Sequence, residues 1–229
     1  MRLSKRLERV AQTVKSGGVV ADVGCDHGFT SIYLVQHRLA GAAIAMDIGQ
    51  GPLGRAAEHV EKYGMADRIT LRLSDGLEKL APGEADTILI SGMGGALMAG
   101  ILERGRQTAQ AAQEMVLSPQ SEIFLVRKKL HEIGFMIDGE DMVEEQGKYY
   151  WILRAVPGRE VYREEEYIYG RKLVEGSHPV FREFLCREYN RLRQVELHMS
   201  SHTLSARGEE KLKKCLAEEE NIQRLLNKM

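Results

Sequence analysis

Short apolar runs alternate with helical patterns through the first two thirds of the chain. The apolar runs are short and rich in valine, isoleucine and alanine, which is typical of buried strands. They predict strands over residues 19–23, 42–47, 69–74, 85–91 and 115–118. Apolar residues at spacings of three and four predict helices over residues 3–15, 30–37, 52–63, 95–104 and 121–133. This alternation predicts an α/β fold with a mostly parallel sheet covered by helices on both faces.

The segment over residues 135–156 has a different pattern. Two strand-like runs flank an acidic turn, and no helical pattern separates them. Strands joined by a short turn pair antiparallel. We therefore expect a hairpin at the edge of the sheet, formed by its last two strands.

The chain changes composition at Pro157 and Gly158, a pair of residues that interrupts regular structure. Beyond them the sequence becomes charged and helical. We therefore expect one domain over residues 1–157 and a second, helical domain over residues 158–229.

The second domain contains two runs of apolar residues at alternating spacings of three and four, separated by a polar segment at residues 200–208. This pattern predicts two antiparallel helices that form a short coiled-coil hairpin. Each run is only about three heptads long and is interrupted by a glutamate, Glu188 or Glu219. The hairpin could be a dimerisation element. These interruptions favour instead a hairpin that closes within one chain, and a monomer.

The composition excludes several classes of protein. The net charge is −1, so only local clusters of charge could indicate a nucleic-acid or membrane partner. The three cysteines are far apart and form no Cys-x-x-Cys motif, which argues against a disulfide framework, a zinc ribbon or an iron–sulfur cluster. The N-terminus is too charged for a signal peptide, and no apolar run approaches the roughly 18–20 residues of a membrane helix. We expect a cytoplasmic protein with no metal and no membrane partner.

The strongest motif follows the first predicted strand, where two glycines and two carboxylates lie within seven residues. Gly24 and Gly28 allow the backbone to turn sharply and approach a ligand at the start of the next helix. A dinucleotide fingerprint would read Gly-x-Gly-x-x-Gly, but here Asp22 and Asp26 lie in or beside the loop. These carboxylates would repel a pyrophosphate and attract a sulfonium or ammonium group. The motif therefore favours S-adenosylmethionine over a dinucleotide.

Three further turns fit the same ligand, because each ends a predicted parallel strand at the same edge of the sheet. Their residues complete a predicted binding site for the donor's ribose, adenine and methyl group: Asp47 and Ile48, Asp75 and Gly76, and Gly92 and Met93. With seven strands and an antiparallel pair last, the pattern predicts a class I methyltransferase with a Rossmann-like sheet. Cys25 is expected to be a packing residue.

The turn after the fourth strand bears on the methyl acceptor. Enzymes that methylate exocyclic amines usually have Asn/Asp-Pro-Pro-Tyr/Phe there, whereas this chain has Ser-Gly-Met-Gly-Gly over residues 91–95. This favours a ring nitrogen as the acceptor. Its lone pair is already nucleophilic, so catalysis would consist mainly of alignment and proton management.

Four segments together resemble the bacterial tRNA adenine-22 N1-methyltransferases, the TrmK family. They are Leu-Ser-Lys-Arg-Leu at residues 3–7, Asp-Val-Gly-Cys-Asp-His-Gly at 22–28, Ser-Gly-Met-Gly-Gly at 91–95 and Leu-Ser-Pro-Gln at 117–120. The resemblance covers residues 1–157, and the C-terminal hairpin is similar to that family's coiled-coil appendage. It implies methyl transfer from S-adenosylmethionine to N1 of an adenine in the D-loop region of tRNA.

The chemistry of three residues in and beside the loop predicts roles for them in this reaction. Asp26 is the candidate catalytic residue, which would contact the target's amino group or take the proton lost after methylation. His27 would bind the donor's carboxylate or sugar, or simply pack at the start of the helix. Phe29 stands where the family usually has tyrosine and would stack on a base, or pack in the core.

The N-terminal segment is the clearest basic region of the chain and a candidate tRNA contact, with Arg2, Lys5, Arg6 and Arg9. Such a run is equally compatible with a solvated helix face. The C-terminal hairpin could be a second arm that grips tRNA. Three alternatives to the main hypothesis stay open on the sequence. They are a methyltransferase for another RNA site, a small-molecule methyltransferase, and a non-catalytic RNA-binding protein with a methyltransferase fold.

Overall fold

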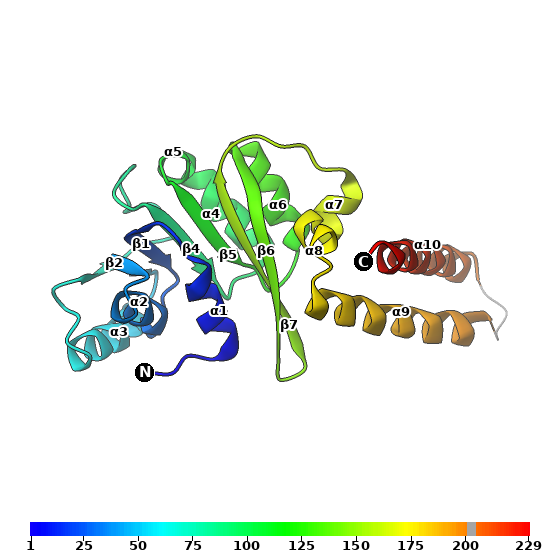
Figure 1. Ribbon diagram of the computed structural model, residues 1–229, viewed down its shortest axis with the longest axis horizontal. Coiled ribbons are helices and arrows are strands. Elements are labelled where there is room, and N and C mark those ends of the chain that lie inside the picture. The colour runs from blue at the N-terminus through cyan, green and yellow to red at the C-terminus, as the bar shows by residue number, and fades with distance from the viewer. Residues whose placement is uncertain (201–204) are drawn as a thin grey trace. The chain divides into compact units, whose positions relative to one another are not determined.

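The computed structural model describes residues 1–200 and 205–229, and its contacts group them into two compact units, residues 1–170 and 171–229. The first unit contains one sheet with helices on either side (Figure 1). Its strands are β1 (Gly17–Val23), β2 (Ala40–Asp47), β3 (Ile69–Leu73), β4 (Thr87–Ser91), β5 (Glu114–Ser118), β6 (Phe135–Glu145) and β7 (Lys148–Pro157). Its helices are α1 (Lys5–Thr13), α2 (Phe29–Gln36), α3 (Gln50–Lys62), α4 (Gly95–Arg104), α5 (Arg106–Gln110), α6 (Ile123–Glu132) and α7 (Glu164–Tyr169).

The seven strands lie in the order β3-β2-β1-β4-β5-β7-β6. The first five pair in parallel, and β7 runs antiparallel to both β5 and β6. The predicted mostly parallel sheet with an antiparallel hairpin at its edge is therefore confirmed. The predicted strand and helix bounds differ from the observed ones by a few residues.

The two faces of the sheet bury different sets of helices, because side chains alternate along each strand. On β1, Ala21 and Val23 pack with α4 and α6 in one core, whereas Val20 packs with α1 and α2 in another. A third cluster joins α2 and α3 to β2. The helices that follow β1 and β2 thus cover one face, and those that follow β4 and β5 cover the other. The point between β1 and β4 where coverage changes is where such sheets bind ligands.

Helix α1 is fixed against the sheet hairpin before the chain enters β1. Ser4 caps the helix by accepting a hydrogen bond from the Leu7 backbone. Glu145 accepts a hydrogen bond from the Lys5 backbone at 2.6 Å, and Arg9 forms an ion pair with Asp141. This anchoring matters for function, because α1 also borders the cavity described below.

The second unit contains α8 (Arg171–Glu175), α9 (Pro179–Ser200) and α10 (Ala206–Lys228). Contacts pair the start of α9 with the end of α10, since Arg182 donates to the Leu226 carbonyl and Cys215 to that of Leu192. The two helices are therefore antiparallel, as the sequence predicted. The connection predicted at residues 200–208 lies partly outside the described residues.

The expected domain boundary at residue 157 lies inside the first compact unit. Residues 158–170 group with the sheet because Arg127, which is fully buried on α6, donates hydrogen bonds to the carbonyls of Tyr167 and Ile168 at 2.7 and 3.0 Å. A contact between residues about 40 positions apart in the sequence cannot be predicted from the local pattern. None of the helices in the described ranges is long and apolar enough to cross a membrane.

Candidate active site

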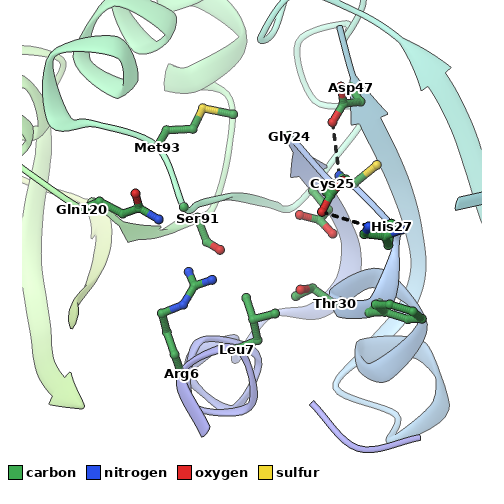
Figure 2. A pocket seen from close by; sticks show the side chains of 14 residues that line it. Arg6, Leu7, Gly24, Cys25, His27, Thr30, Asp47, Ser91, Met93 and Gln120 are labelled. Carbon is green, nitrogen blue, oxygen red and sulfur yellow. Dashed lines mark hydrogen bonds and ion pairs between the residues drawn. The ribbon is translucent and has the colours of Figure 1, made fainter. Parts of the chain in front are cut away.

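A cavity of about 410 Å³ opens at the carboxyl ends of the central strands. Its walls come from the loop after β1, the ends of β2 and β4, the turn after β5 and the first turn of α1 (Figure 2). The lining residues are Arg6, Leu7, Asp22, Gly24, Cys25, Asp26, His27, Phe29, Thr30, Asp47, Ser91, Gly92, Met93 and Gln120. This is the site expected from the position of β1 and β4 in the sheet.

The loop after β1 requires left-handed backbone at three positions. Gly24 and Gly28 have φ angles of +77° and +72°, and Asp26 has a φ of +49°. The Met46 carbonyl on β2 accepts hydrogen bonds from the backbones of Gly24 and Cys25, which fixes the loop to the neighbouring strand. A Cβ at Gly24 would lie 2.2 Å from the terminal methyl of Met93. The glycine therefore lets the turns after β1 and β4 approach each other.

Asp22 is a buried carboxylate at the base of the cavity, with 3% of its surface exposed. Its partner is the Ser31 hydroxyl, which donates a hydrogen bond at 2.7 Å from α2. Burial raises the pKa of Asp22 to about 6, and the hydrogen bonds from Ser31 offset only part of this effect. Such a carboxylate is stabilised by a positively charged ligand.

Asp47 ends β2 and is held by two backbone groups. Its Oδ2 accepts a hydrogen bond from the Asp26 backbone at 3.1 Å, and its Oδ1 accepts one from Gly49 at 2.9 Å. Each oxygen retains a second lone pair for another donor. A rigid carboxylate at this strand end can therefore accept from the hydroxyls of a ribose.

Asp26 lies at the rim of the cavity with 65% of its side chain exposed. Its carboxylate is 3.5 Å from His27 Nε2 and 3.6 Å from a guanidinium nitrogen of Arg55. Phe29 stacks on His59 with ring centroids 4.4 Å apart, and His27 lies 5.7 Å from Phe29. Asp26 is thus an accessible acid held by two basic groups beside a cluster of rings.

Cys25 lines the cavity but is a poor nucleophile. Burial, followed by the charges of Asp22 and Asp47, raises the pKa of its thiol well above the ordinary value. The reactive form of a cysteine is the thiolate. The thiol therefore stays protonated, which fits the expectation that Cys25 is a packing residue.

The cavity brings together six of the ten residues predicted to bind the donor, but the other four lie outside its lining. Ile48 is 70% exposed, Asp75 contacts Arg104 at 3.3 Å, and Gly76 packs against Ile101. Gly28 is close by as the N-terminal cap of α2. The assignment of these four residues to the donor remains a prediction.

Several lining residues have no motif of their own. Thr30 has no local signal that separates it from core residues of a helix, and Leu7 was visible only within the Leu-Ser-Lys-Arg-Leu segment that carries the family resemblance. Ser91 and Gln120 belong to segments that carry the family resemblance, so that resemblance was the signal that could have identified them. Arg55, on α3, reaches Asp26 only because helix packing brings residues 29 positions apart together.

The basic residues of the N-terminal segment point in different directions. Arg6 enters the cavity, whereas Lys5 donates to the Glu144 carbonyl at 3.0 Å and Arg9 pairs with Asp141. Arg2 is exposed. Exposed pairs contribute little stability, so Lys5 and Arg9 could exchange these partners for phosphates.

Comparisons with known proteins agree with this geometry. A family described as a methyltransferase domain matches residues 3–153. The Bacillus subtilis tRNA (adenine(22)-N(1))-methyltransferase is 40% identical over 158 residues, which cover 69% of this chain and 66% of that enzyme. The chain thus spans about two thirds of that relative's length.

Solved structures match over nearly the full length. The B. subtilis TrmK structure is 32% identical with a TM-score of 0.85, and the match covers 98% of this chain and 99% of that one. The Streptococcus pneumoniae protein Sp1610, in complex with S-adenosyl-L-methionine, is 31% identical with a TM-score of 0.87, over 98% and 100% of the two chains.

The fold, the cavity and these matches define the class of protein as a class I methyltransferase that uses S-adenosylmethionine. The resemblance found in the four sequence segments is also confirmed. Within this class, the chain belongs to the TrmK family.

Proposed function

We propose that this protein transfers a methyl group from S-adenosylmethionine to N1 of the adenine at position 22 of tRNA. The observation that carries the proposal is the single cavity wall that unites Asp22, Asp26 and Asp47 at the switch point of the sheet. It is supported by the 40% identity to the B. subtilis enzyme of that name. We further propose that the protein acts in the cytoplasm, as a monomer.

The residues present fit the donor. Asp22 is a buried carboxylate with no cation beside it among the described residues, so it would attract the donor's ammonium group. Asp47 offers fixed acceptors for ribose hydroxyls, and the glycines of the loop leave room for close approach. When bound, S-adenosylmethionine supplies an electrophilic methyl group on a sulfonium.

The acceptor would enter beside the turn after β4, where Ser91, Gly92 and Met93 line the cavity. Adenine N1 carries its own lone pair, so the protein's task is mainly alignment. N1 is buried by stacking or pairing in folded RNA, and the base must therefore be extruded into the site. Phe29 and its neighbouring rings provide apolar surface at the mouth for such a base.

Asp26 is the group we assign to proton management. Methylation at N1 leaves a positive charge on the adenine, which an adjacent carboxylate stabilises. Asp26 is exposed at the rim, and His27 and Arg55 hold it in place. It can therefore accept a hydrogen bond from the exocyclic amine, or its proton.

Contact with the rest of the tRNA would use the basic N-terminal segment, Arg2, Lys5 and Arg9, outside the cavity. These cations lie on or beside α1, which borders the site. Each phosphate that they neutralise would release counterions, so tRNA affinity should fall steeply with salt.

The experiment that tests this function is nucleoside analysis by mass spectrometry after incubating unmodified tRNA with the protein and S-adenosylmethionine. We expect 1-methyladenosine as the new nucleoside. A different methylated nucleoside would indicate another RNA site. Donor binding without any RNA methylation would favour a small-molecule methyltransferase, and no donor binding would favour a non-catalytic RNA-binding protein.

A further inference from the structure

The cavity contains a cation, Arg6, that has no anionic partner among the residues that the structure describes. Arg6 enters from the first turn of α1, and its Nη1 atom is buried with no hydrogen-bond acceptor in the part of the chain that the structure describes. Its guanidinium carbon lies 5.0 Å from the centre of the Tyr150 ring. A buried guanidinium donor without an acceptor is destabilising unless a ligand supplies one. The cavity therefore leaves a place for an anionic group at this wall.

Other unpaired groups surround that place. A Cβ at Gly92 would lie 3.8 Å from both Arg6 Nη1 and Gln120 Nε2, so these two donors approach the same backbone. The Ser118 hydroxyl, at the end of β5, is also buried without a partner among the described residues. In Figure 2, the Arg6 guanidinium points toward Ser91, and Asp47 lies on the other side of the pocket. The donors therefore gather at the ends of β4 and β5.

The opposite wall of the cavity carries negatively charged side chains. Asp22, Asp26 and Asp47 lie on the side formed by β1 and β2. Arg6 is the one lysine or arginine among the described residues that line the cavity. The amino-acid end of S-adenosylmethionine is a zwitterion, with an ammonium and a carboxylate on one carbon. The acidic wall would attract its ammonium and repel its carboxylate, so the carboxylate needs the basic wall.

We propose that Arg6 binds the carboxylate of the methyl donor, while Asp22 attracts the ammonium group. This inference rests on the proposed function and reassigns Arg6 from the RNA contact that the sequence suggested. A phosphate of folded RNA stays at the surface and would not reach a buried nitrogen. A cation held against adenine N1 would also oppose the positive charge that methylation creates.

Helix α1 holds Arg6 in position before the donor arrives. Lys5 and Arg9, on either side in the sequence, are held by the β6–β7 hairpin. Val10 and Ala11 are fully buried against the sheet. The anchored helix fixes the backbone of Arg6, and the Tyr150 ring, 5.0 Å from the guanidinium carbon, restricts the side chain.

The test is isothermal titration calorimetry without RNA, using S-adenosylmethionine and its decarboxylated analogue, which keeps the sulfonium and the ammonium. In the unmodified protein, we expect loss of the carboxylate to weaken binding about 10- to 100-fold, the usual value of a charge-assisted hydrogen bond. The Arg6→Met variant should bind S-adenosylmethionine more weakly by a similar factor. Its affinity for the decarboxylated analogue should stay within about twofold of that of the unmodified protein. The matched control is Lys15→Met, which removes an exposed cation just after α1. It should keep the unmodified protein's ratio of affinities for S-adenosylmethionine and its decarboxylated analogue.

The proposal would be overturned if folded Arg6→Met discriminated between S-adenosylmethionine and its decarboxylated analogue as strongly as the unmodified protein does. Weaker tRNA binding with unchanged donor affinity would instead assign Arg6 to RNA. If Arg6→Met does not fold, Arg6→Lys is the second variant, and it should retain part of the discrimination because it keeps the charge. Failure of the unmodified protein to bind S-adenosylmethionine would reject the proposed function itself.

Discussion

Asp22, which we propose attracts the donor's ammonium group, is a residue whose burial destabilises the free protein. The carboxylate is buried beside a hydroxyl and has a pKa of about 6, against 3.8 when unperturbed. A raised pKa in the folded state means that the unfolding free energy falls as pH rises from about 4 to about 6. Above that range the folded protein holds a buried charge that the hydrogen bonds from Ser31 offset only in part.

Replacing this charge should therefore stabilise the free protein. We expect Asp22→Asn to raise the unfolding free energy by about 1–3 kcal/mol at pH 8, because one pKa unit corresponds to about 1.4 kcal/mol. The gain should be smaller at pH 5, where Asp22 is mostly protonated in the folded state. Donor affinity should fall. Urea denaturation at the two pH values and calorimetry measure these effects, and a gain that did not increase with pH would contradict the assignment.

Asp26 is the residue whose replacement should affect turnover. Its backbone has a φ of +49°, a conformation that asparagine tolerates better than alanine. We therefore choose the Asp26→Asn variant. We expect its turnover at saturating donor to fall about 10- to 100-fold, because a positioned proton acceptor usually contributes about 100-fold or more to the rate. The control is Glu58→Gln, on the exposed surface of α3. Full turnover by folded Asp26→Asn would remove Asp26 from the mechanism.

At the scale of elements, the turn after β4 depends on one close backbone approach. Gly95 begins α4, and a Cβ there would lie 2.5 Å from the carbonyl oxygens of Ser121 and Glu122. Because these neighbours are backbone atoms, they cannot move aside cheaply. The glycine therefore sets how closely α4 approaches the turn that contains Gln120.

We expect Gly95→Ala to lower the unfolding free energy by about 1–3 kcal/mol through overpacking. The matched control is Gly54→Ala in the middle of α3, where a Cβ meets open space. The control should raise stability by roughly 0.5–1 kcal/mol, since alanine favours the helix. Guanidinium denaturation compares the two, and equal effects would show that the packing at Gly95 is not tight.

The elements most visible in the sequence were those with strong local patterns. The sharp turn after β1 was predicted from glycines and carboxylates that lie within seven residues, and the positive φ angles of Gly24 and Gly28 confirm the turn itself. The short helices α5, α7 and α8 were not predicted, since five or six residues give too few apolar positions for a period. Arg6 was recognised as basic, but its direction depends on the anchoring of α1 to the hairpin. Contacts between residues far apart in the sequence cannot be predicted from the spacing of apolar residues.

At the scale of the whole molecule, the second unit bears on oligomeric state. The apolar stripes of α9 and α10 bury Leu185, Leu192, Ile222 and Leu225. The pairing of the two helices covers these residues within one chain, whereas Val195 and Leu216 stay exposed. We expect sedimentation equilibrium to give the mass of one chain, 25.8 kDa, at micromolar concentration. A concentration-dependent shift toward twice that mass would contradict this expectation.

The central claim concerns the atom that is methylated, and one measurement tests it directly. Two tRNA transcripts that differ only in adenine or guanine at position 22 are incubated with the protein and S-adenosylmethionine, digested to oligonucleotides and mapped by mass spectrometry. We predict one added methyl group at position 22 of the adenine transcript, on a fragment that yields 1-methyladenosine, and none in the guanine transcript. Equal methylation of both transcripts, or methylation at another position, would contradict the account.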